Sequence, residues 1–336
     1  MVQWGMKKIL TDLVRQELLL EFCQLFSVFP RSITPLKQHT RCVYEVWDGS
    51  VTYILKLFDS LDRERSEIQG ELDFMRACSQ GGVVTCEPLF SRNARMLESL
   101  PLDAERFAHG FVYPRLAGVE IEEDENAFRE FTPELLFKWG ELLGTIHRIS
   151  RELAQNETHL SRLKWDEMET INHQQCIPAS KSTIHKVFQE TIREIHAIPR
   201  EKGNFGLVHG DLHYGNFFLH DNYLSVIDFD SSCYFYYVAD IAIPLYSVLP
   251  YPRTRREERT QFAKQYLTHF LQGYRTQTFL DKEQEELIPL FLHYEDMANF
   301  IALYRHWDFE RLSPQQKKVL ERNSYHIENR IPIVDL

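Results

Sequence analysis

The chain has 336 residues, of which 43% are hydrophobic and 26% charged, proportions typical of soluble globular proteins. This length allows two lobes, each with a sizeable core. The net charge of −11 argues against general nucleic-acid binding, which requires a basic surface, and it is compatible with a cationic small-molecule ligand or with solubility alone.

Signals of a membrane or secreted protein are missing from the sequence. No apolar run approaches the roughly 20 residues that cross a bilayer, and residues 1–11 contain no apolar core of a secretory signal. The six cysteines are scattered without paired spacing, which indicates reduced thiols rather than disulfides or a zinc site. We therefore expect a cytoplasmic protein with no membrane partner.

The first part of the chain predicts a helix followed by a β-hairpin. Apolar residues at helical spacing indicate an amphipathic helix over residues 11–26. Two β-rich runs, residues 42–47 and 51–58, flank Asp48-Gly49-Ser50, which is a strong hairpin signal. The second run places Lys56 among apolar residues, where an ammonium needs an anionic partner. A lysine that snorkels from an edge strand is the alternative.

Helices are expected over most of the remaining chain. A helix over residues 63–79 contains Glu67 and Glu71 and ends at Gly81-Gly82. Residues 111–116 indicate a strand that Pro114 and Gly118 terminate. The polar residues 151–181 predict an irregular insertion or lid. Further helices are expected over residues 133–150 and around residues 183–198, 240–249, 257–274, 283–307 and 314–329.

The most informative stretch is His209-Gly-Asp-Leu-His-Tyr-Gly-Asn216, followed by Val226-Ile-Asp-Phe-Asp230. Asp211 and Asn216 have the spacing of a protein-kinase catalytic loop, in which the acid meets the acceptor hydroxyl and the amide holds magnesium. Turn-forming residues 220–223 between two apolar runs predict a hairpin that brings Asn216 and Asp228 to the same end. Because carboxylate and amide oxygens suit a hard cation, the pattern predicts phosphoryl transfer from a nucleotide.

These motifs, together with Asp240-Ile-Ala242, resemble the aminoglycoside phosphotransferase and choline kinase-like family. The resemblance implies an α+β, bilobal protein-kinase-like fold with a small N-terminal lobe built on an antiparallel sheet and a larger, mainly helical C-terminal lobe. Residues 1–115 would form the nucleotide-binding lobe including the hinge, and residues 116–336 the catalytic and substrate-binding lobe. Members of this family phosphorylate small molecules, and its bacterial stress-response members phosphorylate proteins.

The resemblance also implies roles for individual residues around ATP and Mg²⁺. Asp211 would accept the proton of the acceptor hydroxyl, and Asn216 and Asp228 would ligate Mg²⁺. His209 would brace the catalytic loop. Asp240 would tie that loop down from a helix start, although a simple helix N-cap is an equally consistent interpretation.

Four residues of the N-terminal lobe are expected at the nucleotide. Lys56 would contact the α- and β-phosphates and be held by Glu71, with Glu67 one helical turn earlier as the reserve candidate. Phe111 and Tyr113 lie in the expected hinge, where backbone groups would bind the adenine ring.

One departure from the family pattern leaves alternatives open. Residues 37–41, where a phosphate-covering loop is expected, contain no glycine, so that Thr40 or Arg41 would have to replace its backbone contacts. A catalytically silent kinase-like binding or coat protein is therefore a second hypothesis, and a stress-response-type protein Ser/Thr kinase a third. A metallophosphoesterase ranks last, because no Asp-x-His segment precedes Gly210-Asp211-x-His213.

The sequence thus predicts an ATP- and Mg-dependent phosphotransferase that acts on a hydroxyl of a small-molecule acceptor. The net charge of −11 is compatible with a cationic acceptor. Aminoglycoside-, choline- and homoserine-like molecules are the acceptor types considered. The residue types of the helical lobe do not define which acceptor binds.

Overall fold

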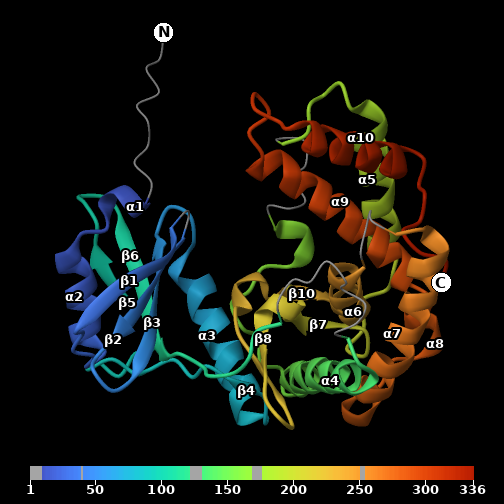
Figure 1. Cartoon of the computed structure of the whole chain (residues 1–336). Helices are drawn as coiled ribbons and strands as arrows, with labels where there is room; N and C mark the ends of the chain where they lie inside the picture. Colours follow the sequence, from blue (N-terminus) through green and yellow to red (C-terminus); the bar gives the residue numbers. More distant parts are fainter. Residues whose placement is uncertain (1–9, 39–40, 122–130, 169–175, 250–253) are drawn as a thin grey trace. The chain divides into compact units, whose positions relative to one another are not determined.

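A computed structural model describes residues 10–38, 41–121, 131–168, 176–249 and 254–336. The chain forms two compact units (Figure 1). The sheet unit comprises Met1–Gly118, Leu160–Arg162 and Ser225–Asp230, and the helical unit comprises Val119–His159, Leu163–Leu224 and Ser231–Leu336.

The sheet unit is built on five antiparallel strands, in the order β1-β2-β3-β6-β5. These strands are β1 (Ser32–Gln38), β2 (Arg41–Trp47), β3 (Thr52–Asp59), β5 (Glu98–Pro101) and β6 (Phe107–Pro114). The predicted hairpin joins β2 to β3. Its turn has Gly49 at φ +108°, and the Asp48 carboxylate accepts hydrogen bonds from the backbone N–H groups of Ser50 and Val51.

Helices of the sheet unit are α1 (Leu10–Leu13), α2 (Gln16–Leu25) and α3 (Arg65–Gln80). The prediction of a single helix over residues 11–26 is therefore wrong in one respect, since two helices cover this segment. Arg15 has an extended backbone (φ −100°, ψ 160°) and separates α1 from α2. α3 ends as predicted, since the backbone N–H of Gly81 donates to the carbonyls of Ala77 and Cys78.

The helical unit contains most of the α-structure. Its helices are α4 (Pro133–Gln155), α5 (Ser182–His196), α6 (Tyr237–Val248), α7 (Arg256–Gln277), α8 (Lys282–Glu285), α9 (Ile288–His306) and α10 (Pro314–Glu328). β7 (Phe205–Val208) and β10 (Cys233–Tyr236) pair antiparallel. The helix expected over residues 283–307 is interrupted between α8 and α9, because Pro289 in the first turn of α9 cannot continue a preceding helix.

β8 (Phe217–Leu219) and β9 (Leu224–Val226) are joined by the predicted turn, in which the N–H of His220 donates to the carbonyl of Tyr223. Ser225 and Val226 of β9 pair in parallel with β4 (Val84–Thr85). Of the predicted insertion or lid, residues 169–175 lie outside the described part of the chain.

All six cysteines are free thiols. No described helix combines the length and apolar character needed to cross a bilayer.

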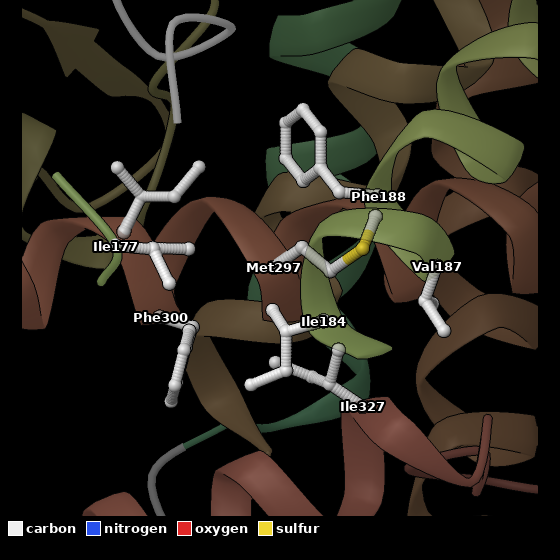
Figure 2. Close-up of a cluster of buried hydrophobic side chains, with 8 residues drawn as sticks. Ile177, Ile184, Val187, Phe188, Met297, Phe300 and Ile327 are labelled. Atoms are coloured by element: carbon white, nitrogen blue, oxygen red, sulfur yellow. The ribbon is translucent and has the colours of Figure 1, made fainter. Parts of the chain in front are cut away.

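A buried cluster fixes the last helices of the helical unit (Figure 2). Its members are Ile177, Ile184, Val187, Phe188, Met297, Phe300, Ile301 and Ile327. They come from α5, α9, α10 and the segment before α5, so burial of their apolar surface holds these helices together. α9 and α10 in turn carry side chains of the cavity described below.

α4 and α7 cross at close range because glycines face backbone on the opposite helix. A Cβ atom at Gly140 would lie 1.8 Å from the carbonyl oxygen of Phe270, and a Cβ atom at Gly273 would lie 1.9 Å from that of Phe137. Neither position has room for alanine unless the helices separate.

We expect Gly140→Ala to destabilise the protein by about 1–3 kcal/mol, because the overpacking outweighs the gain of about 1 kcal/mol from the better helix former. Urea unfolding measures this change. Gly203→Ala, in a turn outside this crossing, is the control for the added methyl group alone, since its Cβ would lie 3.7 Å from the nearest atom of Phe279, an ordinary contact. Equal stabilities of the two variants would contradict the close crossing.

Candidate active site

Lys56 lies in the interior of the sheet unit among three carboxylates. Its Nζ is 3.0 Å from Oδ1 of Asp228 and 3.5 Å from Oε1 of Glu71, and it also contacts Oδ1 of Asp230. β3 is flanked by β2 and β6, and Lys56 is 4% exposed, so the alternative of a snorkelling lysine on an edge strand is wrong. The anionic partners that a buried ammonium needs are present.

Glu71, on α3, is the glutamate that pairs with Lys56. Its second carboxylate oxygen lies 3.0 Å from Nη1 of Arg63. Burial would raise the pKa of Glu71, but the positive charges of Lys56, Arg63 and Arg162 outweigh burial and hold that pKa below its ordinary value. Glu67, the reserve candidate, is more exposed and lies 3.9 Å from Arg63.

The segment that carries Asp228 and Asp230 is held in a tight conformation. Asp228 has φ +64°, a left-handed conformation that costs a non-glycine residue roughly 1–2 kcal/mol. Phe229 is fully buried and packs edge-on against Phe74, with ring centroids 5.6 Å apart. Thr85 donates a 2.8 Å hydrogen bond to the carbonyl of Val226. Such strain persists only where the surroundings enforce it, and it is common at functional sites.

Two arginines hold this segment against α3. Arg63 donates a 2.9 Å hydrogen bond from Nη2 to the carbonyl of Asp230, and Arg162 donates to the same oxygen. Arg162 also donates from Nη1 to the carbonyl of Glu67 at 2.9 Å. The preceding Ser161 lies against Gly70, where a Cβ atom would come within 2.3 Å of the Ser161 carbonyl oxygen. Leu160–Arg162 therefore forms a strap over α3.

The helical unit contains Asp211 and Asn216 in direct contact. Nδ2 of Asn216 donates to the backbone carbonyl of Asp211 at 2.7 Å and to its Oδ2 at 3.1 Å. Nδ1 of His209 accepts from the N–H of Asp211 at 3.3 Å. Gly210 has φ +79°, and a Cβ atom there would lie 2.3 Å from the carbonyl oxygen of Ser231. Glycine is therefore required at the turn that presents Asp211.

Asp240 fixes this turn from the first turn of α6. Its carboxylate accepts 2.9 Å hydrogen bonds from the backbone N–H groups of His209 and Gly210, and one of 3.0 Å from Nε2 of His147. Asp240 lies inside α6, whose N-cap is Tyr236, so the alternative of a simple N-cap is wrong. Burial would raise the pKa of Asp240, but its hydrogen bonds outweigh burial and lower the pKa.

His147 and Tyr274 extend the Asp240 network into the core. Nδ1 of His147 lies 2.9 Å from the hydroxyl of Tyr274, so this hydroxyl donates to Nδ1 while Nε2–H donates to Asp240. His147 is completely buried, and burial lowers its pKa below the ordinary value of 6.5. Sequence reasoning missed both residues, because a lone histidine within an apolar helix pattern gives no functional signal.

A cavity of about 550 Å³ lies within the helical unit next to Asp211. Its polar lining includes Asp211, His213, Glu295, Asn299 and Arg322. The volume suits a small organic ligand. The cavity is formed by the catalytic loop and by α6, α9 and α10, and no described residue of the segment 151–181 lines it.

Both units offer oxygen atoms suited to a hard divalent cation. Asp228 contributes a carboxylate that is already close to a cation, Lys56. In Asn216, Nδ2 faces Asp211, so the amide oxygen Oδ1 lies on the opposite side and is the atom that could ligate a metal. These donor types match Mg²⁺.

Comparison with known proteins assigns the family. Residues 32–280 match the family model described as the phosphotransferase enzyme family. The chain belongs to this family. A curated relative, the amicoumacin kinase of Bacillus subtilis (strain 168), is 28% identical over 291 residues, which are 87% of this chain and 85% of the relative.

Solved structures extend the similarity to the fold. An amicoumacin kinase in complex with AMP-PNP, Ca²⁺ and Ami has a TM-score of 0.89 at 29% identity, covering 97% of this chain and 96% of that one. An aminopropanol kinase associated with a microcompartment has a TM-score of 0.68 at 18% identity, covering 88% and 90%. The choline kinase of Streptococcus pneumoniae has a TM-score of 0.61 at 15% identity, covering 94% and 99%.

The predicted family, the α+β protein-kinase-like fold and the enzyme class are thus confirmed. This member of the phosphotransferase family is a kinase with an alcohol group as the phosphate acceptor. The predicted roles of individual residues stay predictions.

Arg162 gives the first prediction from the site. Arg162→Gln should destabilise the protein by about 1–3 kcal/mol, because Glu71 loses a countercharge and the Asp230 carbonyl loses a charged donor. Urea unfolding measures the loss, and Arg162→Lys should recover part of it. Arg95 is exposed, so Arg95→Gln is the control for the loss of one arginine charge. Equal free energies of unfolding for Arg162→Gln and Arg95→Gln would show that the strap does not stabilise α3.

His147 gives a second prediction, which concerns pH. A group whose folded pKa is depressed contributes stability above its unfolded pKa and loses that contribution as the pH falls through the folded pKa. The stability difference between wild type and His147→Gln should therefore be largest near pH 7.5 and shrink toward about pH 5. Urea unfolding at both pH values tests this, and a constant difference would show that His147 does not titrate as assigned.

Proposed function

We propose that this kinase uses Mg-ATP and transfers the γ-phosphate to a hydroxyl of a small molecule bound in the 550 Å³ cavity. The observation that carries the proposal is Asp211, an acid on a rigidly held turn that lines this cavity. The similar amicoumacin kinase was solved with AMP-PNP and Ca²⁺, which supports a nucleotide and a divalent cation here. We also propose that the enzyme acts in the cytoplasm.

Asp211 is the proposed base. Its carboxylate would orient the acceptor hydroxyl and take its proton as the oxygen attacks the γ-phosphorus. The hydrogen bond from Asn216 and the Asp240 network position that carboxylate before the acceptor arrives. Catalysis of this kind depends on positioning more than on covalent chemistry.

Residues of the proposed nucleotide-binding lobe, 1–115, would hold ATP. Lys56 would contact the α- and β-phosphates, and Glu71 would hold Lys56 in place. Phe111 and Tyr113 on β6 would contribute the backbone groups of the adenine site, with residues 116–336 forming the catalytic and acceptor-binding lobe. Of the residues considered in place of a glycine-rich loop, Thr40 lies outside the described part of the chain.

Asn216, through its amide oxygen, and Asp228, through its carboxylate, are the proposed Mg²⁺ ligands. When bound, the metal would neutralise negative charge on the transferring phosphoryl group. The names of the similar proteins make amicoumacin and aminopropanol the first acceptors to assay.

We expect Asp211→Asn to lower phosphoryl transfer by about 10²–10⁴-fold, the usual contribution of a positioned base, while Mg-ATP binding is retained. Acceptor-dependent ADP formation and thermal stabilisation by Mg-ATP measure the two properties separately. Asp221→Asn, on the exposed turn after β8, is the matched control.

Three outcomes would count against the assignment. Loss of Mg-ATP binding in folded Asp211→Asn would contradict the role of a base. No thermal response of the wild type to Mg-ATP would favour the catalytically silent hypothesis. Transfer to a protein substrate with none to small molecules would favour the protein-kinase hypothesis.

A further inference from the structure

Two arginines of the sheet unit converge on one backbone carbonyl of the segment that carries Asp228. Nη2 of Arg63 donates to the carbonyl of Asp230 at 2.9 Å, and Nη2 of Arg162 donates to the same oxygen. Hydrogen bonds from a charged donor are stronger than those between neutral groups. Two guanidinium groups on a single carbonyl therefore hold this backbone more firmly than one ordinary turn hydrogen bond would.

Each arginine is also anchored to α3. Nη1 of Arg63 pairs with the carboxylate of Glu71 at 3.0 Å, and the guanidinium lies over the ring of Phe58, 5.1 Å from its centroid. Nη1 of Arg162 donates at 2.9 Å to the backbone carbonyl of Glu67. Both side chains are thus fixed at a second point. Arg63 and Arg162 together form an arginine clamp that joins α3 to the Asp228 segment.

The backbone held by the arginine clamp is strained. Asp228 has φ +64°, and a chain free to relax would prefer an ordinary conformation to this left-handed one by about 5- to 30-fold. Thr85 fixes the backbone before Asp228 through its hydrogen bond to the carbonyl of Val226. The clamp fixes the backbone two residues after it, at Asp230. Restraints on both sides are what a strained residue needs to keep its conformation.

The arginine clamp also supplies countercharge when Lys56 changes partners. Nζ of Lys56 lies within 4 Å of the carboxylates of Glu71, Asp228 and Asp230. Nη1 of Arg63 is 3.0 Å from Glu71 and 3.7 Å from Oδ1 of Asp230. These two carboxylates therefore keep a cation when the Lys56 ammonium turns to a phosphate. The segment does not have to rearrange to avoid buried, uncompensated charge.

We propose that Arg63 and Arg162 are positioning residues for divalent-cation binding. Their clamp on the Asp230 carbonyl holds Asp228 in the strained conformation in which its carboxylate is presented to the cation. This inference rests on the proposed function, in which Asp228 ligates Mg²⁺, and adds the residues that set the affinity of that ligand site. Both arginines act through the backbone of another residue.

Mn²⁺ binding in the presence of AMP-PNP tests this inference without turnover, because EPR distinguishes bound from free Mn²⁺. Arg162→Gln removes one arm of the clamp, whereas a change at Arg63 would also remove the countercharge of Glu71. Once Asp228 can relax, the binding conformation becomes a minor state, and we expect about 5- to 30-fold weaker Mn²⁺ binding. Arg162→Lys keeps the charge without the planar fork and should recover only part of the affinity.

A second variant displaces the arginine clamp without changing any charge. A Cβ atom at Gly70 on α3 would lie 2.3 Å from the carbonyl oxygen of Ser161, so Gly70→Ala must push the residue next to Arg162 away from the helix. Alanine is the better helix former, so the helix itself is not weakened by the exchange. Mn²⁺ binding should weaken in Gly70→Ala as it does in Arg162→Gln.

Arg65→Gln is the matched control. Arg65 is also an arginine of α3 that donates to a backbone carbonyl, but this carbonyl is that of Leu97, next to β5, at 2.9 Å. The variant should lose stability as Arg162→Gln does and keep the wild-type affinity for Mn²⁺. Hydrogen exchange of the amides of residues 227–231, measured without ligand, reports on the clamp directly. It should be faster in Arg162→Gln and Gly70→Ala than in Arg65→Gln.

Each other result decides against one part of the argument. Wild-type Mn²⁺ affinity in folded Arg162→Gln or in Gly70→Ala, or full recovery in Arg162→Lys, would overturn the arginine clamp. Equal losses of affinity in Arg65→Gln and Arg162→Gln would show an effect of general stability and would overturn it as well. Faster exchange in the two clamp variants, together with no Mn²⁺ binding by the wild type, would instead overturn the proposed function of Asp228.

Discussion

Two buried carboxylates, Glu71 in the sheet unit and Asp240 in the helical unit, each organise the residues around them, because neither can remain ionised without donors from distant parts of the chain. Glu71 takes its countercharges from β3, from Arg63 before α3 and from the strap residue Arg162. Asp240 takes its donors from the turn before Asp211 and from His147 on α4. In each case the carboxylate fixes a segment that carries a proposed functional residue.

Helix packing supports the second of these arrangements. At Gly144, one turn after Gly140 on α4, a Cβ atom would lie 2.6 Å from the carbonyl oxygen of Tyr274 on α7. The same close crossing brings the Tyr274 hydroxyl within 2.9 Å of His147. Small residues at one crossing thus set the hydrogen bond that orients His147, which in turn holds Asp240 and the turn of Asp211. A packing change far from the cavity would consequently reach the proposed base through three hydrogen-bonded steps.

The sequence predicted the residues whose chemistry follows from local pattern. Lys56 was predicted as a site residue because a charge interrupts an apolar strand, and Asp211, Asn216 and Asp228 were predicted because their spacing is that of a known reaction. Arg162 could not be found, since it acts from an irregular segment and no periodicity places it over α3. The break between α8 and α9 is a similar case for a whole helix. The apolar pattern predicted one helix over residues 283–307, whereas Pro289 in the first turn of α9 separates α9 from α8.

A ligand that binds among the charged groups of the sheet unit must replace contacts that the chain already makes. In the sheet unit, Glu71, Asp228 and Asp230 each lie within 4 Å of a cation of the chain itself, so a phosphate or metal that binds there must exchange partners with Lys56 or Arg63. The positive charges of Lys56, Arg63 and Arg162 therefore compensate the buried carboxylate of Glu71 until such a ligand arrives.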